Sequence, residues 1–182
     1  MNRIGNMNGR FVLAFLAALL IGAGNIDAQV KWHSIEEAST AQIGNKLYFV
    51  DFYTTWCKFC IKMDKYTFSD PTVAKILNNY YYPVKFNAES NCTFTWHGHT
   101  YKPRNGQHEF ASSIRGFPTF VLFRPNGTPI QQIPGFYSAK DFTIILWYFA
   151  SGDCDRYSYA QYQRIFEKDI RPQMEQALKK AK

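Results

Sequence analysis

Two cysteines stand three residues apart in the segment TTWCKFCIKMD, residues 54–64, where an apolar run gives way to helical periodicity. At a helix N-terminus, unpaired backbone N–H groups and the helix dipole favour a thiolate, the form of cysteine that attacks disulfides. A second cysteine one turn later is close enough to resolve the mixed disulfide. We therefore expect Cys57 to be the exposed nucleophile and Cys60 the more buried resolving thiol of a redox pair.

Two other interpretations of this cysteine pair stay open. Structural zinc is held by four ligands, so a zinc site would need two more. His97 and His99, at the tip of a predicted hairpin, could supply them. The two thiols could also simply pack in a core. Nothing in the sequence places the hairpin over Cys57, and the strand-then-helix context favours redox chemistry, so we expect no metal and no cofactor.

Three charged residues near the pair bear on its redox direction. Asp51 interrupts the apolar strand that precedes the pair. Asp64 follows the second cysteine by four residues, and Lys58 stands between the two cysteines. The two acids oppose a negative thiolate, whereas the lysine favours one. A less stabilised thiolate makes the pair more reducing, so this balance favours a reductant. For Asp51, a strand aspartate with a purely structural role is the alternative.

The elements that must position these residues alternate between strand and helix. Continuous β-branched and aromatic runs predict strands over residues 46–54 and 80–88, and two further strands joined by a turn at residues 125–127. Helical spacing, glycine stops and caps, such as the capping box from Ser34 to Glu37, predict helices over residues 33–44, 57–68, 69–80, 108–114, 138–152 and 157–182. Strands separated by helices pair in parallel, so we predict an α/β fold in which a mixed sheet has helices on both faces.

Single residues refine this arrangement. One face of the helix after Cys57 is expected to be buried through its apolar residues Phe59, Ile61, Met63, Tyr66 and Phe68. The segment CTFTWHGHTYK predicts a hairpin insertion at about residues 92–106. Pro172 predicts a kink in the last helix. We expect one domain over residues 29–152 and a C-terminal helical extension over residues 153–182.

The order of these motifs resembles the thioredoxin superfamily. A strand leads into WCKFC at a helix start, and IRGFPTFVLF, residues 114–123, matches the segment that carries the cis-proline of the superfamily. The resemblance covers residues 47–152 and implies a thioredoxin-like fold, with Pro118 as the cis-proline. It also implies that Asp51 is the buried aspartate that exchanges protons with Cys60. Substrates would contact Trp56, Phe117 and Pro118.

The segment DFYTTWCKFCIKMDKYTFSDPTV is similar in particular to the C-terminal periplasmic domain of the DsbD reductases. Those domains carry a second acid four residues after the resolving cysteine, which is Asp64 here. Lys58 and Phe59, between the cysteines, match neither thioredoxin nor DsbD, and the hairpin and the last helix are additional. The resemblance implies a reductase of protein or peptide disulfides. Its electrons would come from a separate donor protein, a membrane protein being one candidate.

Two other functions fit the same motifs. A disulfide oxidase or isomerase would use the same pair at a more oxidising potential. A non-redox binding module would use the thioredoxin scaffold alone, with the hairpin side chains Phe94, Trp96 and Tyr101 holding a partner. An intact cysteine pair with a supporting acid argues against the binding module, because a scaffold needs neither.

The first 28 residues have the pattern of a signal peptide. Arg3 and Arg10 precede the apolar stretch FVLAFLAALLIGAG, whose 14 residues are too few to span a bilayer comfortably. Ile26 and Ala28 fit a cleavage site. We expect export to a periplasm or secretion, an uncleaved anchor being the alternative. Removal of two arginines and one aspartate with this segment would lower the formal net charge from +7 to +6.

The composition is that of a globular protein, with 46% hydrophobic and 18% aromatic residues, which is enough for a core without disulfide support. Basic residues are scattered except near the C-terminus, so nucleic-acid binding is not expected. In the fold that the resemblance implies, Cys92 follows a strand that ends on the active-site side, whereas Cys154 follows a helix that runs away from that side. This separation disfavours a bridge, because bridged Cα atoms lie within about 7 Å. Cys92 fits a third thiol near the site or a small buried side chain.

Overall fold

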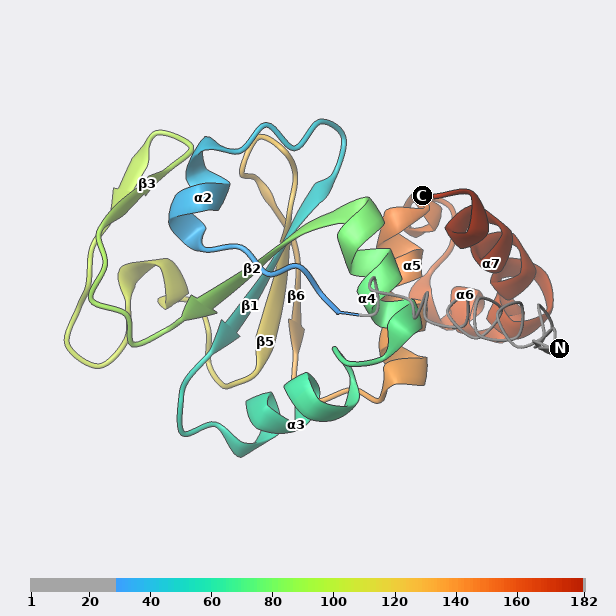
Figure 1. Cartoon of the computed structure of the whole chain (residues 1–182), viewed down its shortest axis with the longest axis horizontal. Helices are drawn as coiled ribbons and strands as arrows, with labels where there is room; N and C mark the ends of the chain where they lie inside the picture. The colour runs from blue at the N-terminus through green and yellow to red at the C-terminus, as the bar shows by residue number, and fades with distance from the viewer. Residues whose placement is uncertain (1–28, 182) are drawn as a thin grey trace, which may run out of the picture.

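The computed structural model describes residues 29–181, so the predicted signal peptide over residues 1–28 lies outside the described residues. The elements follow one another (Figure 1) in the order α2 (Ile35–Thr40), β1 (Leu47–Tyr53), α3 (Lys58–Tyr66), α4 (Pro71–Tyr80), β2 (Tyr81–Asn87), β3 (Phe94–Trp96), β4 (His99–Tyr101), a 3₁₀ turn (Glu109–Ala111), β5 (Thr119–Phe123), β6 (Pro129–Pro134), α5 (Ala139–Ala150), a second 3₁₀ turn (Asp153–Asp155), α6 (Tyr159–Ile165), a π-helical turn (Phe166–Ile170) and α7 (Arg171–Lys180). No helix between residues 29 and 181 is long and apolar enough to cross a membrane.

A four-stranded sheet with the order β2-β1-β5-β6 forms the centre of the molecule (Figure 1). β1 pairs in parallel with β2 and antiparallel with β5, and β5 pairs antiparallel with β6. The connection through α3 and α4 is long enough for the parallel pair, and a short turn joins the last two strands. The predicted mixed sheet with helices on both faces is therefore confirmed.

The sheet separates two apolar clusters because successive side chains of a strand point to opposite faces. Phe49 and Phe120 belong to the cluster with α4, α5 and the C-terminal helices, whereas Val50 and Val121 belong to the cluster with α2 and the insertion. Figure 1 shows these two layers on either side of the sheet. β1 is buried on both faces, which explains why its sequence LYFVDFY is an almost unbroken apolar run.

The insertion between β2 and β5 packs on the α2 face of the sheet. Its hairpin strands place Phe94 and Trp96 in the core, where both are buried. The buried His108 ring anchors the insertion, because its Nδ1 atom accepts the Phe110 N–H and Nε2 donates to the carbonyl of Cys92 at 3.0 Å. The hypothesis that these hairpin aromatic side chains hold a partner is therefore wrong for Phe94 and Trp96, since they cover the sheet.

The tip of the hairpin lies at the end of the sheet opposite to the cysteine pair. The His97 ring packs over the β5–β6 turn, where a Cβ atom on Gly127 would stand 2.2 Å from the His97 Cδ2 atom. Gly127 also has a φ of +80°, so the contact and the backbone both require glycine. Because β5 begins at the cysteine end of the sheet and finishes at this turn, His97 does not approach Cys57. The arrangement excludes a zinc site that combines those two residues.

α2 is shorter than its predicted extent. It ends at Thr40 rather than near Gly44, because Ala41 is already extended, and Gly44, with a φ of +61°, forms the turn into β1. The predicted capping box is present. The Ser34 hydroxyl accepts the Glu37 N–H at 3.1 Å, and the Glu37 carboxylate accepts the Ser34 N–H at 2.8 Å.

The last predicted helix is interrupted one turn before Pro172. The π-helical turn separates α6 from α7, and Pro172 lies in the first turn of α7. Proline has no N–H, and its ring crowds the carbonyl four residues earlier, which is that of Lys168. The disturbance therefore falls inside the π-helical turn, which takes the place of the predicted kink.

The C-terminal helices pack on the rest of the chain through buried apolar side chains. Tyr162, Phe166 and Met174 are fully buried and belong to the same core cluster as α4 and α5. Figure 1 shows α6 and α7 beside α5, on the side away from β3. These helices therefore contribute to the core of the domain instead of extending into solvent.

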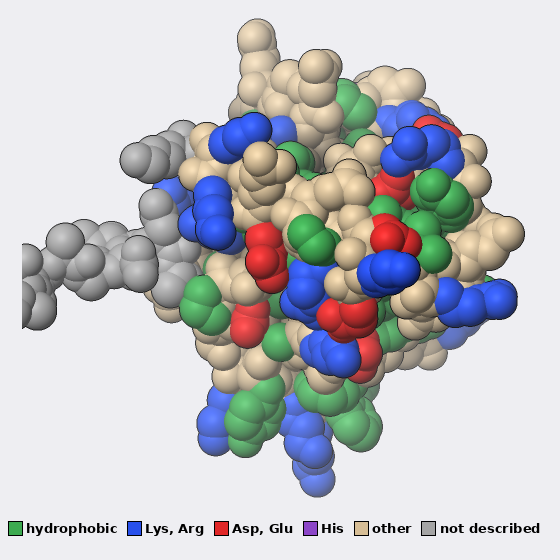
Figure 2. All heavy atoms as spheres, turned by 90° about the vertical axis from the view of Figure 1, so that its right-hand side faces the viewer, with side chains coloured by type: hydrophobic (Ala, Val, Ile, Leu, Met, Phe, Trp, Pro, Cys, Tyr) green, Lys and Arg blue, Asp and Glu red, His purple; other side chains and the backbone are tan. Residues whose placement is uncertain are grey.

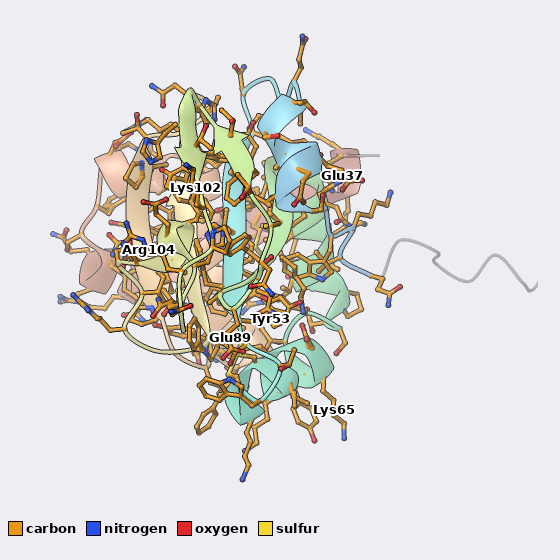
Figure 3. The ribbon with its side chains drawn as sticks, turned by 90° about the vertical axis from the view of Figure 1, so that its left-hand side faces the viewer. Glu37, Tyr53, Lys65, Glu89, Lys102 and Arg104 are labelled. Carbon is orange, nitrogen blue, oxygen red and sulfur yellow. A yellow bond between two sulfur atoms is a disulfide. The ribbon has the colours of Figure 1, made fainter. Side chains whose placement is uncertain are left out.

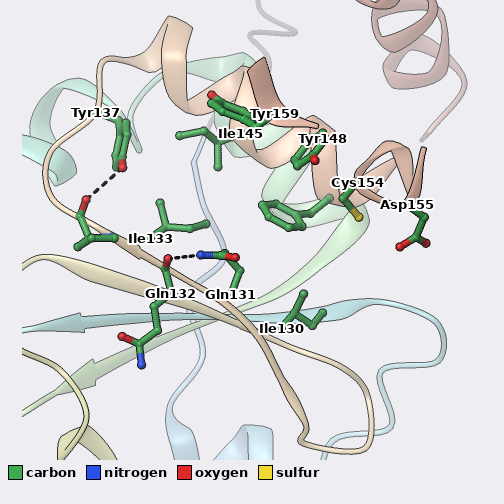
Figure 4. A pocket seen from close by; sticks show the side chains of 12 residues that line it. Ile130, Gln131, Gln132, Ile133, Tyr137, Ile145, Tyr148, Cys154, Asp155 and Tyr159 are labelled. Carbon is green, nitrogen blue, oxygen red and sulfur yellow. Dashed lines mark hydrogen bonds between the residues drawn. The ribbon is translucent and has the colours of Figure 1, made fainter. Parts of the chain in front are cut away.

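β6 forms an edge of the sheet that side chains of the same chain cover. The Gln131 amide donates to the carbonyl of Gln132 at 2.8 Å, and the Tyr137 hydroxyl donates to the carbonyl of Pro134 at 3.1 Å (Figure 4). Pro129 and Pro134, at the two ends of the strand, have no N–H to offer. These features disfavour pairing of this edge with another chain.

We predict that Phe166→Ala lowers the free energy of unfolding by about 3–5 kcal/mol, the usual cost of removing a fully buried phenylalanine side chain. Lys168→Ala, two residues away and exposed, should change it by less than about 0.5 kcal/mol. Urea unfolding followed by tryptophan fluorescence measures both values. Equal effects of the two substitutions would contradict the packing of the C-terminal helices on the domain.

Candidate active site

The topology brings four loops together at one end of the sheet. β1 and β2 run to this end in parallel, β5 starts from it, and β6 returns to it. The segments after β1, after β2, before β5 and after β6 therefore meet there, and α3 lies at the same end (Figure 1). They carry, in this order, Cys57, Glu89, Pro118 and Phe136. The Phe117–Pro118 peptide bond, just before β5, is cis.

Cys57 and Cys60 form a disulfide at the start of α3. Cys57 is the N-cap of this helix, and its Sγ atom accepts the Cys60 N–H at 3.1 Å. Both cysteines are 5% exposed, so the expectation that Cys57 is the more exposed of the two is wrong for the disulfide form. The position of Cys57 distinguishes it instead, because its sulfur receives an N–H donor at the positive end of the helix dipole.

A carboxylate and a lysine face each other across the two neighbouring strands that lead to this end. Asp51 on β1 is 2% exposed and stands opposite Lys85 on β2 in the parallel register. The Lys85 Nζ atom lies 3.8 Å from Asp51 Oδ2, while Asp51 Oδ1 has no hydrogen-bond partner among the described residues. Lys85 was not predicted from the sequence. The sequence signal that could have identified it is a lysine within the apolar run of residues 80–88, since the apolar run of residues 46–54 contains an aspartate.

Burial raises the pKa of Asp51 from 3.8 to about 7, since the charged form loses its hydration in the core. Lys85 opposes this shift, and the negative charge of Asp64 adds to it. A carboxyl group whose pKa lies near neutrality can both accept and release a proton at physiological pH. Asp51 therefore has the property required of a proton acceptor.

Asp64, in the second half of α3, pairs its carboxylate with Lys85. Lys85 thus bridges Asp51 and Asp64, so the two acids predicted from the sequence belong to one cluster. The Lys85 Nζ atom also lies 5.2 Å from the ring centroid of Trp32 and 5.3 Å from that of Tyr53. Aromatic faces attract a cation at such distances, which helps to hold the lysine between the two acids.

Aromatic side chains surround the disulfide at the surface. Trp56 is 65% exposed and packs edge-on against Phe117, with 6.2 Å between the ring centroids. Its indole N–H donates to the Glu89 carboxylate at 3.0 Å. On α3, Phe59 lies beside Phe136 of the loop after β6, with 6.5 Å between centroids. Phe59, Phe136 and Glu89 were not predicted as site residues, because they come together only through the topology of the sheet.

The apolar residues of α3 do not share one buried face. Met63 is buried, as is Phe68 beyond the helix end, but Phe59, Ile61 and Tyr66 are 54%, 57% and 57% exposed. At 100° per residue, Ile61 points away from the side of α3 that buries Cys60 and Met63, whereas Phe59 and Tyr66 stand at the edge of that side. The expectation of burial is therefore wrong for these three side chains, and they form part of the surface around the pair.

The insertion leaves the cysteine end of the sheet open. In Figure 3, Lys102 and Arg104 of the insertion lie above Tyr53 and Glu89, and Lys65 projects from α3 at the bottom of the view. The Arg104 guanidinium pairs with the Glu109 carboxylate at 2.8 Å, so this part of the insertion is held by a contact between its own residues. A partner can therefore reach the surface around the disulfide.

The other two cysteines are free thiols on opposite faces of the sheet, so the disfavoured bridge is absent. Cys154 lines a pocket of about 520 Å³ between β6 and helices α5 and α6, beside Tyr148 and Asp155 (Figure 4). Burial raises the pKa of both Cys92 and Cys154, which makes them poor nucleophiles near neutral pH. Within residues 29–181, no group of three or more histidine, cysteine or acidic side chains could hold a metal ion.

Comparison with known protein families agrees with this architecture. The thioredoxin-like domain family matches residues 36–150. The chain belongs to this family. The matched residues include the disulfide, Asp51, Lys85 and Pro118, whereas α6 and α7 come after them in the chain. The predicted resemblance to thioredoxins is confirmed.

The thioredoxin-like domain is similar to part of several curated relatives. The thiol:disulfide interchange protein DsbD of Photorhabdus laumondii is 32% identical over 113 residues, which cover 61% of this chain and 18% of that protein. DsbD of Yersinia enterocolitica is 28% identical over 152 residues, 72% of this chain and 24% of that protein. The chain thus spans about a fifth of the length of these relatives. A solved thioredoxin from Thermus thermophilus is 22% identical with a TM-score of 0.49, over 65% of this chain and 85% of that one.

The raised pKa of Asp51 predicts how the stability of the domain depends on pH. Between pH 3.8 and about 7, the folded state holds a proton on Asp51 that the unfolded state has released. Stability therefore falls as the pH rises through this interval and stays lower above it. Asp51→Asn removes the titrating group, so it should stabilise the oxidised protein more at pH 8 than at pH 4, by on the order of 1–3 kcal/mol.

Urea unfolding of the oxidised protein at both pH values measures this difference. Gln163→Ala is the control, because Gln163 is exposed on α6 and has no titrating group, so its effect should be equal at the two pH values. A change in stability by Asp51→Asn that is equal at the two pH values would contradict the raised pKa.

Proposed function

We propose that the chain is a thiol–disulfide oxidoreductase that acts mainly as a reductase of disulfides in proteins or peptides. The observation that carries this proposal is the Cys57–Cys60 disulfide at the N-terminus of α3, with Asp51 buried on the preceding strand and its pKa raised to about 7. The DsbD relatives are named thiol:disulfide interchange proteins, which supports the same type of reaction.

The proposed reaction begins with the reduced cysteine pair. The Cys57 thiolate attacks one sulfur of the substrate disulfide, forms a mixed disulfide and releases the other substrate sulfur as a thiolate. Cys60 then gives up its proton, for which Asp51 is the acceptor, and attacks the Cys57 sulfur. This step releases the second substrate sulfur as a thiolate and leaves the pair oxidised, so two electrons have passed to the substrate.

The charges around the pair support the reducing direction. Asp51, on the strand before the pair, and Asp64, four residues after Cys60, would oppose a thiolate when charged and so favour the disulfide form of the pair. Lys85 offsets part of this effect because it pairs with both acids. Lys58, at the first position of α3, offsets a further part. A disulfide oxidase or isomerase is the alternative function, in which the two lysines outweigh the two acids.

The partners follow from this reaction. We assign the contact with a substrate disulfide to Trp56, Phe117 and Pro118. The exposed Trp56 ring, which packs against Phe117, supports this assignment. The oxidised pair must be reduced again, and we assign this step to a separate electron-donor protein, a membrane protein being the first candidate. The signal-peptide pattern of residues 1–28 supports export to a periplasm or secretion.

Alanine substitutions separate the roles of the two cysteines. Cys57→Ala should abolish the reduction of insulin disulfides, because the attacking thiolate is lost. Cys60→Ala should accumulate mixed disulfides on non-reducing gels, since no thiol remains to resolve them. Cys92→Ala removes a thiol outside the pair and should keep the wild-type rate. Normal turnover by the Cys57→Ala protein would refute the proposed function.

The reduction potential of the pair distinguishes a reductase from an oxidase. For the purified protein equilibrated in dithiothreitol buffers, we expect a value near that of thioredoxin, about −270 mV. Asp64→Asn should make the pair more oxidising, because it removes a negative charge that opposes the thiolate. A wild-type value of about −120 to −180 mV would instead favour an oxidase or isomerase.

A further inference from the structure

The exposed side of α3 carries a row of lysines that begins next to the disulfide. Lys58, Lys62 and Lys65 are spaced by four and three residues, so their side chains lie along one side of the helix. All three are exposed, and no ion pair within residues 29–181 engages them. Asp64, the single acid in the sequence of α3, pairs with Lys85 on β2 instead.

Apolar side chains border these lysines on both sides. At 100° per residue, Ile61 lies on one side of the row, and Phe59 and Tyr66 lie on the other. The Lys62 Nζ atom is 5.4 Å from the Phe59 ring centroid, and the Lys65 Nζ atom is 5.0 Å from the Tyr66 ring centroid. We call the exposed residues at positions 58, 59, 61, 62, 65 and 66 the α3 face.

The charge of the α3 face is of one sign. Figure 2 shows basic and apolar side chains next to one another at the lower end of the molecule, the end at which α3 lies, with no acidic side chain among them. The acidic Glu89 at this end of the sheet is bound to the Trp56 indole and comes from the segment after β2, not from α3.

The α3 face is unfavourable for an isolated domain. Lysines at spacings of four and three residues repel one another, and Lys58 stands at the positive end of the helix dipole. Three exposed apolar side chains on the same helix remain in contact with water. A partner with acidic and apolar groups relieves both costs, because the lysines gain ion pairs and the apolar side chains leave water.

A protein fits this face better than a lipid surface does. The face begins at the residue after Cys57, so a sulfur that exchanges with Cys57 brings its flanking residues over the first turn of α3. Those flanking residues meet Lys58, Phe59 and Lys62. A bilayer offers acidic head groups and apolar chains, but it has no cysteine to exchange with the pair.

We propose that the α3 face is a docking surface for a redox partner that carries acidic residues, with apolar residues among them, beside its reactive cysteine. This proposal rests on the proposed function and adds the charge of the partner to it. It requires no chemistry beyond the thiol–disulfide exchange described above.

Two disulfide-bonded peptides test the proposal with the purified, reduced protein. They share one cysteine loop and differ only in the residues next to the cysteines, which are glutamates in one peptide and glutamines in the other. At about 20 mM NaCl, we expect exchange with the acidic peptide to be at least about threefold faster. At about 0.5 M NaCl the two rates should converge, because salt screens exposed charges.

A pair of double variants locates the effect on α3. Lys62→Gln/Lys65→Gln leaves the two cysteines and the residues between them intact, and it should slow exchange with the acidic peptide about threefold. Its rate with the neutral peptide should equal that of the wild type, which also shows that the variant is folded and its cysteine pair is active. Lys179→Gln/Lys180→Gln, at the end of α7, makes the same change in net charge and should alter neither rate.

Each outcome decides between the proposals. Equal rates for the two peptides at low salt, or an acidic preference that persists in Lys62→Gln/Lys65→Gln, would overturn the docking proposal and leave the proposed function standing. A wild-type protein that exchanges with neither peptide would overturn both. Vesicles with about one-third phosphatidylserine test the lipid alternative. Binding to them that the Lys62→Gln/Lys65→Gln variant loses, without a preference for the acidic peptide, would assign the face to a membrane.

Discussion

The pair formed by the buried Asp51 and the partly exposed Lys85 is the constraint around which the site is arranged. A carboxylate in the central strand of the sheet would be costly without a cation, and the parallel register of β1 and β2 places Lys85 directly opposite. Burial still outweighs the lysine in setting the pKa of Asp51. A stronger pair would lower that pKa and make Asp51 a poorer proton acceptor. The proposed chemistry therefore depends on an incomplete ion pair, in which one carboxylate oxygen of Asp51 has no partner within residues 29–181.

The features that were predictable from the sequence are those that depend on local patterns. The strand over residues 46–54, the helix start at Cys57 and the capping box at Ser34 each follow from periodicity or from a motif of fixed spacing. Lys85 was missed because its role depends on the register between two strands that are separated by two helices. Phe136 was missed for a similar reason, since only the return of β6 brings it to the cysteine end.

Two groups of apolar residues were assigned to the wrong environment, in opposite directions. The binding-module alternative has Phe94 and Trp96 hold a partner, yet they are buried; Phe59 and Tyr66 are expected to be buried, yet they are exposed. Hydrophobicity shows that a side chain gains from leaving water, but not which surface it will cover. The α2 face of the sheet needs the hairpin to complete its core, whereas Phe59, Ile61 and Tyr66 on α3 remain more than half exposed.

The two sides of α3 differ in how strongly packing restricts their side chains. Cys60 and Met63 point into the core, where a change of shape or volume affects packing. Lys58, Lys62 and Lys65 face solvent, where most substitutions change stability little. The outward side of this helix therefore tolerates substitution at little cost in stability, whereas the inward side is constrained by its packing. The same helix can in this way hold a cysteine pair in a fixed interior setting while its solvent side is altered independently of the core.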